Sequence, residues 1–140
     1  MTEKVSKMMS RKSKMMHEAA EECRKHCKES FERGVWNMAV RRAQEAVELE
    51  LKSILALLGM DYPKDHDQAP LLMRVLNARG IEIDGYREAR QIESISADLS
   101  RKRGPALQQE EGYTKEVAEN AISGVNYIFD VTKELRGILT

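Results

Sequence analysis

One segment of this chain, from Trp36 to Asp67, limits the possible fold more than any other. It reads WNMAVRRAQEAVELELKSILALLGMDYPKDHD, and its apolar residues recur at intervals of three and four. That spacing is typical of a helix with one buried face, here about six turns long. Gly59 predicts the end of this helix, because glycine adopts a positive φ without strain. The apolar positions are Trp36, Ala39, Val40, Ala43, Ala46, Val47, Leu51, Ile54, Leu57 and Leu58.

The composition favours helices along the whole chain. Aromatic residues make up 5% of the 140 residues and only three prolines occur, so strand formers and helix breakers are scarce. The length suits one domain and we find neither a repeat nor a linker, which predicts a single domain over residues 1–140. Lys and Arg number 23, as do Asp and Glu. Nucleic-acid binding would therefore need a local basic patch, since no overall field attracts a polyanion.

Nothing in the sequence indicates export or membrane insertion. The longest apolar run, Ile54 to Met60, is far shorter than the roughly 18 residues of a membrane span, and charges interrupt the start of the chain. We therefore expect a cytoplasmic protein that does not bind membranes. Cys23 and Cys27 offer no disulfide framework, and together with His26 they fall short of a four-ligand zinc site. The sequence predicts neither a metal nor a cofactor.

Five helices account for the periodicity. We expect the first at about residues 7–32, the second up to Gly59, a short third at 68–78, a fourth at 86–102 and a fifth from Thr114 to the end. Residues 81–85 should form a turn and residues 104–113 a loop, because Gly104 and Pro105 should stop the fourth helix. Asp67 should cap the third helix. The inward stripe of the first helix should comprise Met8, Met9, Met15, Met16, Ala19, Ala20, Cys23, Cys27 and Phe31.

These elements predict an all-α fold. Short connections make successive helices antiparallel neighbours, so we expect an up-down bundle of four or five helices with one short helix inserted.

Two segments of the chain also resemble a known family. ERGVWNMAVRRAQEAVELELKSILALLGMDYPKDHD looks like the second helix and following loop of HEPN domains (higher eukaryotes and prokaryotes nucleotide-binding), and RKRGPALQQEEGYTKEVAENA is similar to their last part. The resemblance covers about residues 19–139. It implies a helical bundle that is usually a homodimer and often works beside a minimal nucleotidyltransferase. Some members are metal-independent RNA endonucleases with an Arg followed, after four to six residues, by a His.

This chain departs from that nuclease motif. After Arg101 the corresponding positions hold Ala106, Leu107 and Gln108, and after Arg103 they hold Gln108, Gln109 and Glu110. Metal-free RNA cleavage needs a group of near-neutral pKa to move the proton and a cation to hold the developing charge. Glutamine cannot transfer a proton, so no catalytic residue is predicted from the motif.

The candidate binding residues are the basic triplet, which we define as Arg101, Lys102 and Arg103, and His66. The triplet could contact phosphate groups, or it could cap the end of the fourth helix. His66 lies between Asp65 and Asp67, whose carboxylates could orient its ring, or it could be an ordinary loop residue. A second basic run, Lys4, Lys7, Arg11, Lys12 and Lys14, has a simple explanation as a solvated helix start.

The sequence thus favours a non-catalytic HEPN-like module. We expect a homodimer that binds a nucleotidyltransferase partner, the phosphate of a nucleotide or RNA, or both. The alternative is a toxin-type, metal-independent RNA endonuclease that uses Arg101 or Arg103 with a displaced base such as His66. A third interpretation is a bundle with an assembly role alone.

Overall fold

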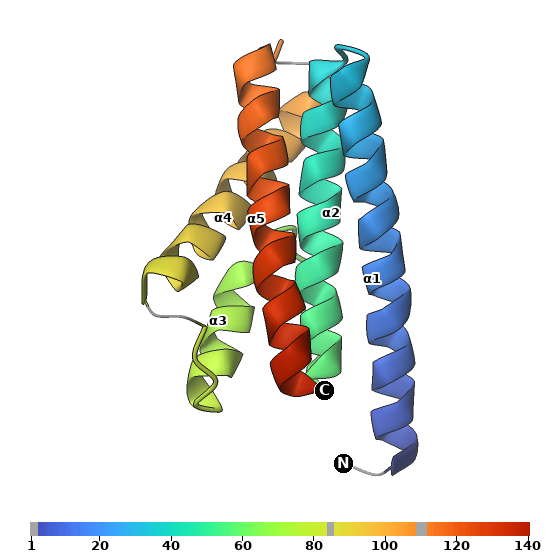
Figure 1. Cartoon of the computed structure of the whole chain (residues 1–140), viewed down its shortest axis with the longest axis vertical. Coiled ribbons are helices and arrows are strands. Elements are labelled where there is room, and N and C mark those ends of the chain that lie inside the picture. The colour runs from blue at the N-terminus through green and yellow to red at the C-terminus, as the bar shows by residue number, and fades with distance from the viewer. Residues whose placement is uncertain (1–2, 84–85, 109–111) are drawn as a thin grey trace.

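A computed structural model describes residues 3–83, 86–108 and 112–140. Within these ranges the protein consists of five helices and no strand: α1 (Glu3–Glu32), α2 (Trp36–Leu57), α3 (Ala69–Ala78), α4 (Tyr86–Gln108) and α5 (Lys115–Leu139). Figure 1 shows α1, α2 and α5 side by side along the long axis, with α4 crossing them obliquely. The short α3 comes between α2 and α4 in the sequence. The predicted all-α bundle with an inserted short helix is confirmed.

Helix α2 is the centre of the bundle, because it contacts each of the other four helices. Its predicted apolar stripe is buried or partly buried throughout. Burial extends further round the helix than the sequence suggested, and it includes the polar residues Gln44, Glu50 and Ser53. The expectation of a single dry side was therefore too narrow.

Gly59 follows the end of α2 as the sequence predicted, and Gly34 follows the end of α1. Gly34 and Gly59 have φ angles of 74° and 76°, in the left-handed region that a side chain with Cβ rarely adopts. The two-residue reversal at Gly34 makes α1 and α2 antiparallel neighbours, as predicted (Figure 1).

The predicted inward stripe of α1 is confirmed in part. Ala20 and Cys27 are buried as predicted. Met8 and Met15 are instead among the most exposed apolar side chains, and Ala19 is exposed as well. The prediction was wrong there because it counted methionines as core residues, and it left out Ser13, which is buried with its hydroxyl hydrogen-bonded.

Helix α4 continues well past its predicted end. It runs through Gly104 and Pro105 to Gln108, so the expected loop at residues 104–113 is wrong over its first half. Ala106 is fully buried, and packing at this position holds the chain helical although Pro105 removes one backbone hydrogen bond. Residues 109–111 of the expected loop, and residues 84–85 of the expected turn, lie outside the described residues.

The predicted N-cap of α5 is confirmed, and that of α3 is wrong. Thr114 caps α5, since its side chain accepts a hydrogen bond from the backbone N–H of Val117. The N-cap of α3 is Gln68 rather than Asp67. None of the described helices has the length and apolar character needed to cross a membrane.

Candidate functional site

The basic triplet lies inside α4 rather than at its end. The helix continues for five more residues after Arg103, so the helix-capping explanation of the triplet is wrong. Asp98 is the shared partner of the first two cations, at 3.4 Å from Arg101 Nη2 and 2.5 Å from Lys102 Nζ. Arg103 makes no hydrogen bond or ion pair with any other described residue. One carboxylate thus pairs with two of the three cations and Arg103 has none, which leaves this part of α4 positive.

The three cations point in different directions. Successive helix residues are about 100° apart, so the triplet cannot present one flat surface. Arg101 is the outermost, with 72% of its side chain exposed. Arg103 lies two turns after Ser96 on nearly the same face of α4. Only Arg103 therefore shares the face of α4 that meets the loop before α3.

Tyr113 fixes this part of α4 against the start of α2. Its hydroxyl donates to the backbone carbonyl of Lys102 at 3.3 Å, and its backbone N–H donates to Asn37 Oδ1 at 2.9 Å. The triplet is consequently held in a defined position relative to α2.

His66 is held by a carboxylate of α2 and not by its sequence neighbours. Its Nδ1 lies 2.8 Å from Glu48 Oε1, and half of the side chain is exposed. Asp67 instead accepts a hydrogen bond from Ser96 Oγ at 2.7 Å, while Asp65 accepts one from the backbone N–H of Asp67. The expectation that the flanking aspartates orient the ring is wrong, because Glu48 does so.

Glu48 is well suited to hold an imidazole. Burial alone would raise the pKa of its carboxyl group, but hydrogen bonds from Lys52, Gln44 and His66 outweigh burial and lower that pKa below its ordinary value of 4.5. The Lys52 contact is 2.7 Å and the Gln44 contact 2.9 Å. The carboxylate is therefore ionised at neutral pH and fixes Nδ1 of His66, which leaves Nε2 for another partner.

Asp67 links the loop that carries His66 to the helix that carries Arg103. Its carboxylate accepts a hydrogen bond from Ser96 Oγ of α4, and Arg103 follows Ser96 by seven residues, or about 10 Å along the axis of α4. The two side chains are held by different elements, the loop before α3 and α4 itself. Such groups can bind phosphate with a guanidinium and an oriented imidazole.

Comparison with models of protein families gives a match to the HEPN domain over residues 13–135. The chain belongs to the HEPN family. The family predicted from the sequence is thus confirmed over most of the chain. Searches among curated proteins and among solved structures found no match.

This HEPN domain has no histidine at the nuclease positions. Of the residues that could replace it after Arg101, Ala106 is fully buried in the core and carries no proton-transfer group. Gln109 and Glu110, which follow Arg103 at the required spacing, lie outside the described residues. His66 comes from a separate loop, which is bonded to α4 through Asp67 and Ser96.

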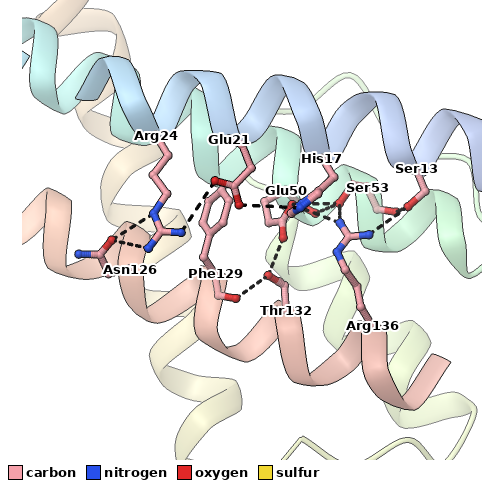
Figure 2. A network of polar contacts seen from close by, with 10 residues as sticks. All are labelled: Ser13, His17, Glu21, Arg24, Glu50, Ser53, Asn126, Phe129, Thr132 and Arg136. Atoms are coloured by element: carbon pink, nitrogen blue, oxygen red, sulfur yellow. Dashed lines mark hydrogen bonds and ion pairs between the residues drawn. The ribbon is translucent and has the colours of Figure 1, made fainter. Parts of the chain in front are cut away.

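A second polar cluster in the HEPN domain was not predicted. Figure 2 shows Glu50 of α2 at its centre, enclosed by α1 and α5. The Glu50 side chain is 1% exposed, and its carboxylate lies 2.7 Å from His17 Nδ1, 3.2 Å from Arg136 Nη2 and 2.6 Å from Thr132 Oγ1. Each of the three helices thus contributes to one buried carboxylate.

Two serines complete this Glu50 cluster. Ser53 Oγ donates to Glu50 and accepts from Arg136, and Ser13 Oγ donates to the backbone carbonyl of Ser53 at 2.6 Å (Figure 2). A pointer existed in the sequence, since Ser13 and His17 lie four residues apart on one face of α1. It gave no indication that Glu50, 33 residues after His17, was the partner.

The two cysteines are structural. Burial, helped by the neighbouring Glu45 carboxylate, raises the pKa of Cys23 to about 11, and burial raises that of Cys27 to about 12. Cys27 Sγ donates to the backbone carbonyl of Ala39. Both thiols are protonated at neutral pH and are poor nucleophiles. Across the described ranges, no three His, Cys, Asp or Glu side chains come together as a metal site would require.

The Glu50 cluster should be essential for stability. We expect Glu50→Ala to lower the free energy of unfolding by about 3–5 kcal/mol, because it leaves the partly buried guanidinium of Arg136 without its counter-ion and the hydroxyl of Thr132 without its acceptor. Urea unfolding followed by circular dichroism measures the change. Glu134→Ala, which removes an exposed carboxylate of α5, is the matched control and should cost less than about 0.5 kcal/mol. Equal losses in the two variants would contradict the assignment.

Glu48 should make stability depend on pH. Because its folded-state pKa is below the unfolded value, its contribution is complete above about pH 4.5 and is lost as the pH falls through the folded-state pKa. The stability difference between wild type and Glu48→Gln should therefore shrink as the pH is lowered from 7 to 3. Urea unfolding of both proteins at several pH values tests this, and a difference that grows in acid would refute it.

Proposed function

We propose that this HEPN domain is a non-catalytic, homodimeric binding module. Its ligand is the phosphate of a nucleotide or RNA, held by Arg103 and His66, and a minimal nucleotidyltransferase is its expected protein partner. The observation that carries the proposal is the position of Arg103. Its side chain has no partner among the described residues, and it follows, on nearly the same face of α4, the Ser96 that holds the loop with the half-exposed His66 imidazole.

The chemistry of these groups supports phosphate binding. A guanidinium presents paired N–H donors that match two phosphate oxygens, and it stays charged at any relevant pH. The imidazole adds a donor whose direction is set by Glu48. Lys102 and Arg101 add positive charge close by, although Asp98 neutralises part of it.

The same geometry argues against cleavage. A 2′-hydroxyl attack needs the base and the stabilising cation around one phosphate, held within hydrogen-bond distance. Arg103 lies about two turns of α4 beyond Ser96, the residue that holds the loop carrying His66. One observation favours the rival RNA endonuclease, namely that His66 is paired with a carboxylate as a general base would be. The binding experiment below therefore includes a check for cleavage.

We expect Arg103→Ala to weaken binding of a short single-stranded RNA about tenfold, since a charge-assisted hydrogen bond contributes on the order of 1.5 kcal/mol. Fluorescence anisotropy at low salt measures the affinity. Arg79→Ala removes one exposed arginine at the end of α3 and is the matched control, with little expected effect. Loss of affinity in both variants alike would show a response to net charge alone and would sink the proposal.

The RNA recovered from each titration, run in EDTA, should remain intact. Cleavage by the wild type that disappears in both Arg103→Ala and His66→Ala would establish the endonuclease instead.

We expect a homodimer in solution. The positive segment of α4 would then occur twice, and a second copy would close a groove around an anionic ligand. Light scattering coupled to size exclusion should give about twice the chain mass of 16.0 kDa at micromolar concentration. A mass of one chain across that range would rule the dimer out.

A further inference from the structure

The first half of α1 carries a row of cations on one face. Lys4, Lys7, Arg11 and Lys14 follow the three-and-four spacing of a helix face, are all exposed, and extend over about 15 Å. We call these four residues the α1 basic row. Figure 1 shows that this end of α1 extends beyond the neighbouring ends of α2 and α5. The row is therefore open to a large ligand.

The fold itself gives no reason for the row. The opposite face of α1 packs on the bundle through Ser13, Ala20 and Cys27. Like charges at these spacings destabilise a helix by a few tenths of a kcal/mol per pair. Among the described residues, one carboxylate forms an ion pair with the row: Glu3 lies 3.2 Å from Lys7 Nζ. This pair is exposed and contributes little. An external anion would compensate the repulsion.

Contacts between side chains connect this half of α1 to the candidate site. Lys12 Nζ lies 4.7 Å from the centre of the Tyr62 ring, and Lys52 Nζ lies 5.2 Å from the same centre. Lys52 is also bonded to Glu48, which holds His66. Two ammonium groups from different helices thus converge between the α1 basic row and His66.

We propose that the α1 basic row, with Lys12 and Lys52, forms a track for the phosphodiester backbone of single-stranded RNA that leads to Arg103 and His66. This inference rests on the proposed function and makes it more specific, because a mononucleotide could contact only the end of such a track. A row of cations is complementary in charge to a chain of phosphates, and each ion pair releases a counter-ion on binding.

The track does not suit a membrane surface. A helix that lies in the lipid interface needs a continuous apolar face with large side chains. Beside the α1 basic row the exposed large apolar residues are Met8 and Met15. Binding to anionic vesicles without binding to RNA would therefore count against the track.

The experiment compares two triple variants of the full chain. Lys7→Ala/Arg11→Ala/Lys14→Ala removes three cations of the row, and Lys25→Ala/Lys28→Ala/Arg33→Ala removes three exposed cations at the other end of α1. Affinity for a 15-nucleotide RNA, a 5-nucleotide RNA and ADP is measured as a function of salt. Circular dichroism confirms that both variants keep the helical content of the wild type.

For the 15-nucleotide RNA, log affinity falls as log salt rises. We expect the row variant to make this negative slope shallower by about 2, at about 0.7 per lost contact. Its affinity for ADP should be unchanged, and the control variant should resemble the wild type. An unchanged slope, an equal loss in the control variant, or binding to anionic vesicles without binding to RNA would overturn the track.

Failure of the track is distinguishable from failure of the proposed function. If the wild type binds the RNA and Arg103→Ala weakens it while the row variant does not, the track is wrong and the site stands. If the row variant weakens binding and Arg103→Ala does not, the track stands and the site is wrong. If the wild type binds neither RNA nor ADP, both proposals fail together.

Discussion

The burial of α2 on nearly all sides is the constraint on which the rest of the structure depends. A helix in contact with four others has no wholly solvated face, so each polar side chain that it carries must find a partner. Glu50 finds donors on α1 and α5, whereas Glu48 finds them on its own helix and on the loop before α3. The two carboxylates lie two residues apart and serve opposite sides of α2. One anchors the bundle, and the other positions the candidate binding residue.

The Glu50 cluster explains how α1 can be both firmly attached and largely polar. Along its buried row, α1 supplies small residues and few large apolar ones, so it gains less from the hydrophobic effect than α2 or α5 does. Ser13 and His17 add directed contacts to α2, and Arg24 bonds Asn126 of α5 and lies over the ring of Phe129 (Figure 2). These contacts fix the rotation of α1, and that rotation turns the α1 basic row outward.

The sequence was sufficient for the helices and the family, but not for most side-chain partners. Periodicity and glycines placed α2 and α5, because buried stripes and helix ends are local properties. Pro105 misled the prediction for α4, since the packing of Ala106 and the Tyr113 hydroxyl are tertiary contacts that outweigh local preference. His66 was identified with the wrong partners, because Asp65 and Asp67 are its neighbours in sequence while Glu48 is its neighbour in space.

The distribution of positive charge argues for binding to an extended ligand. A catalytic site for phosphate cleavage gathers its base and its cation around one atom, and this chain has no histidine four to six residues after Arg101 or Arg103. Its cations are instead spread along α1, beside Tyr62 and within α4, each anchored by a different helix. Spread charges add affinity with each phosphate that they meet and contribute little to any single reacting centre. This distribution of charge is what the proposed binding of a chain of phosphates requires.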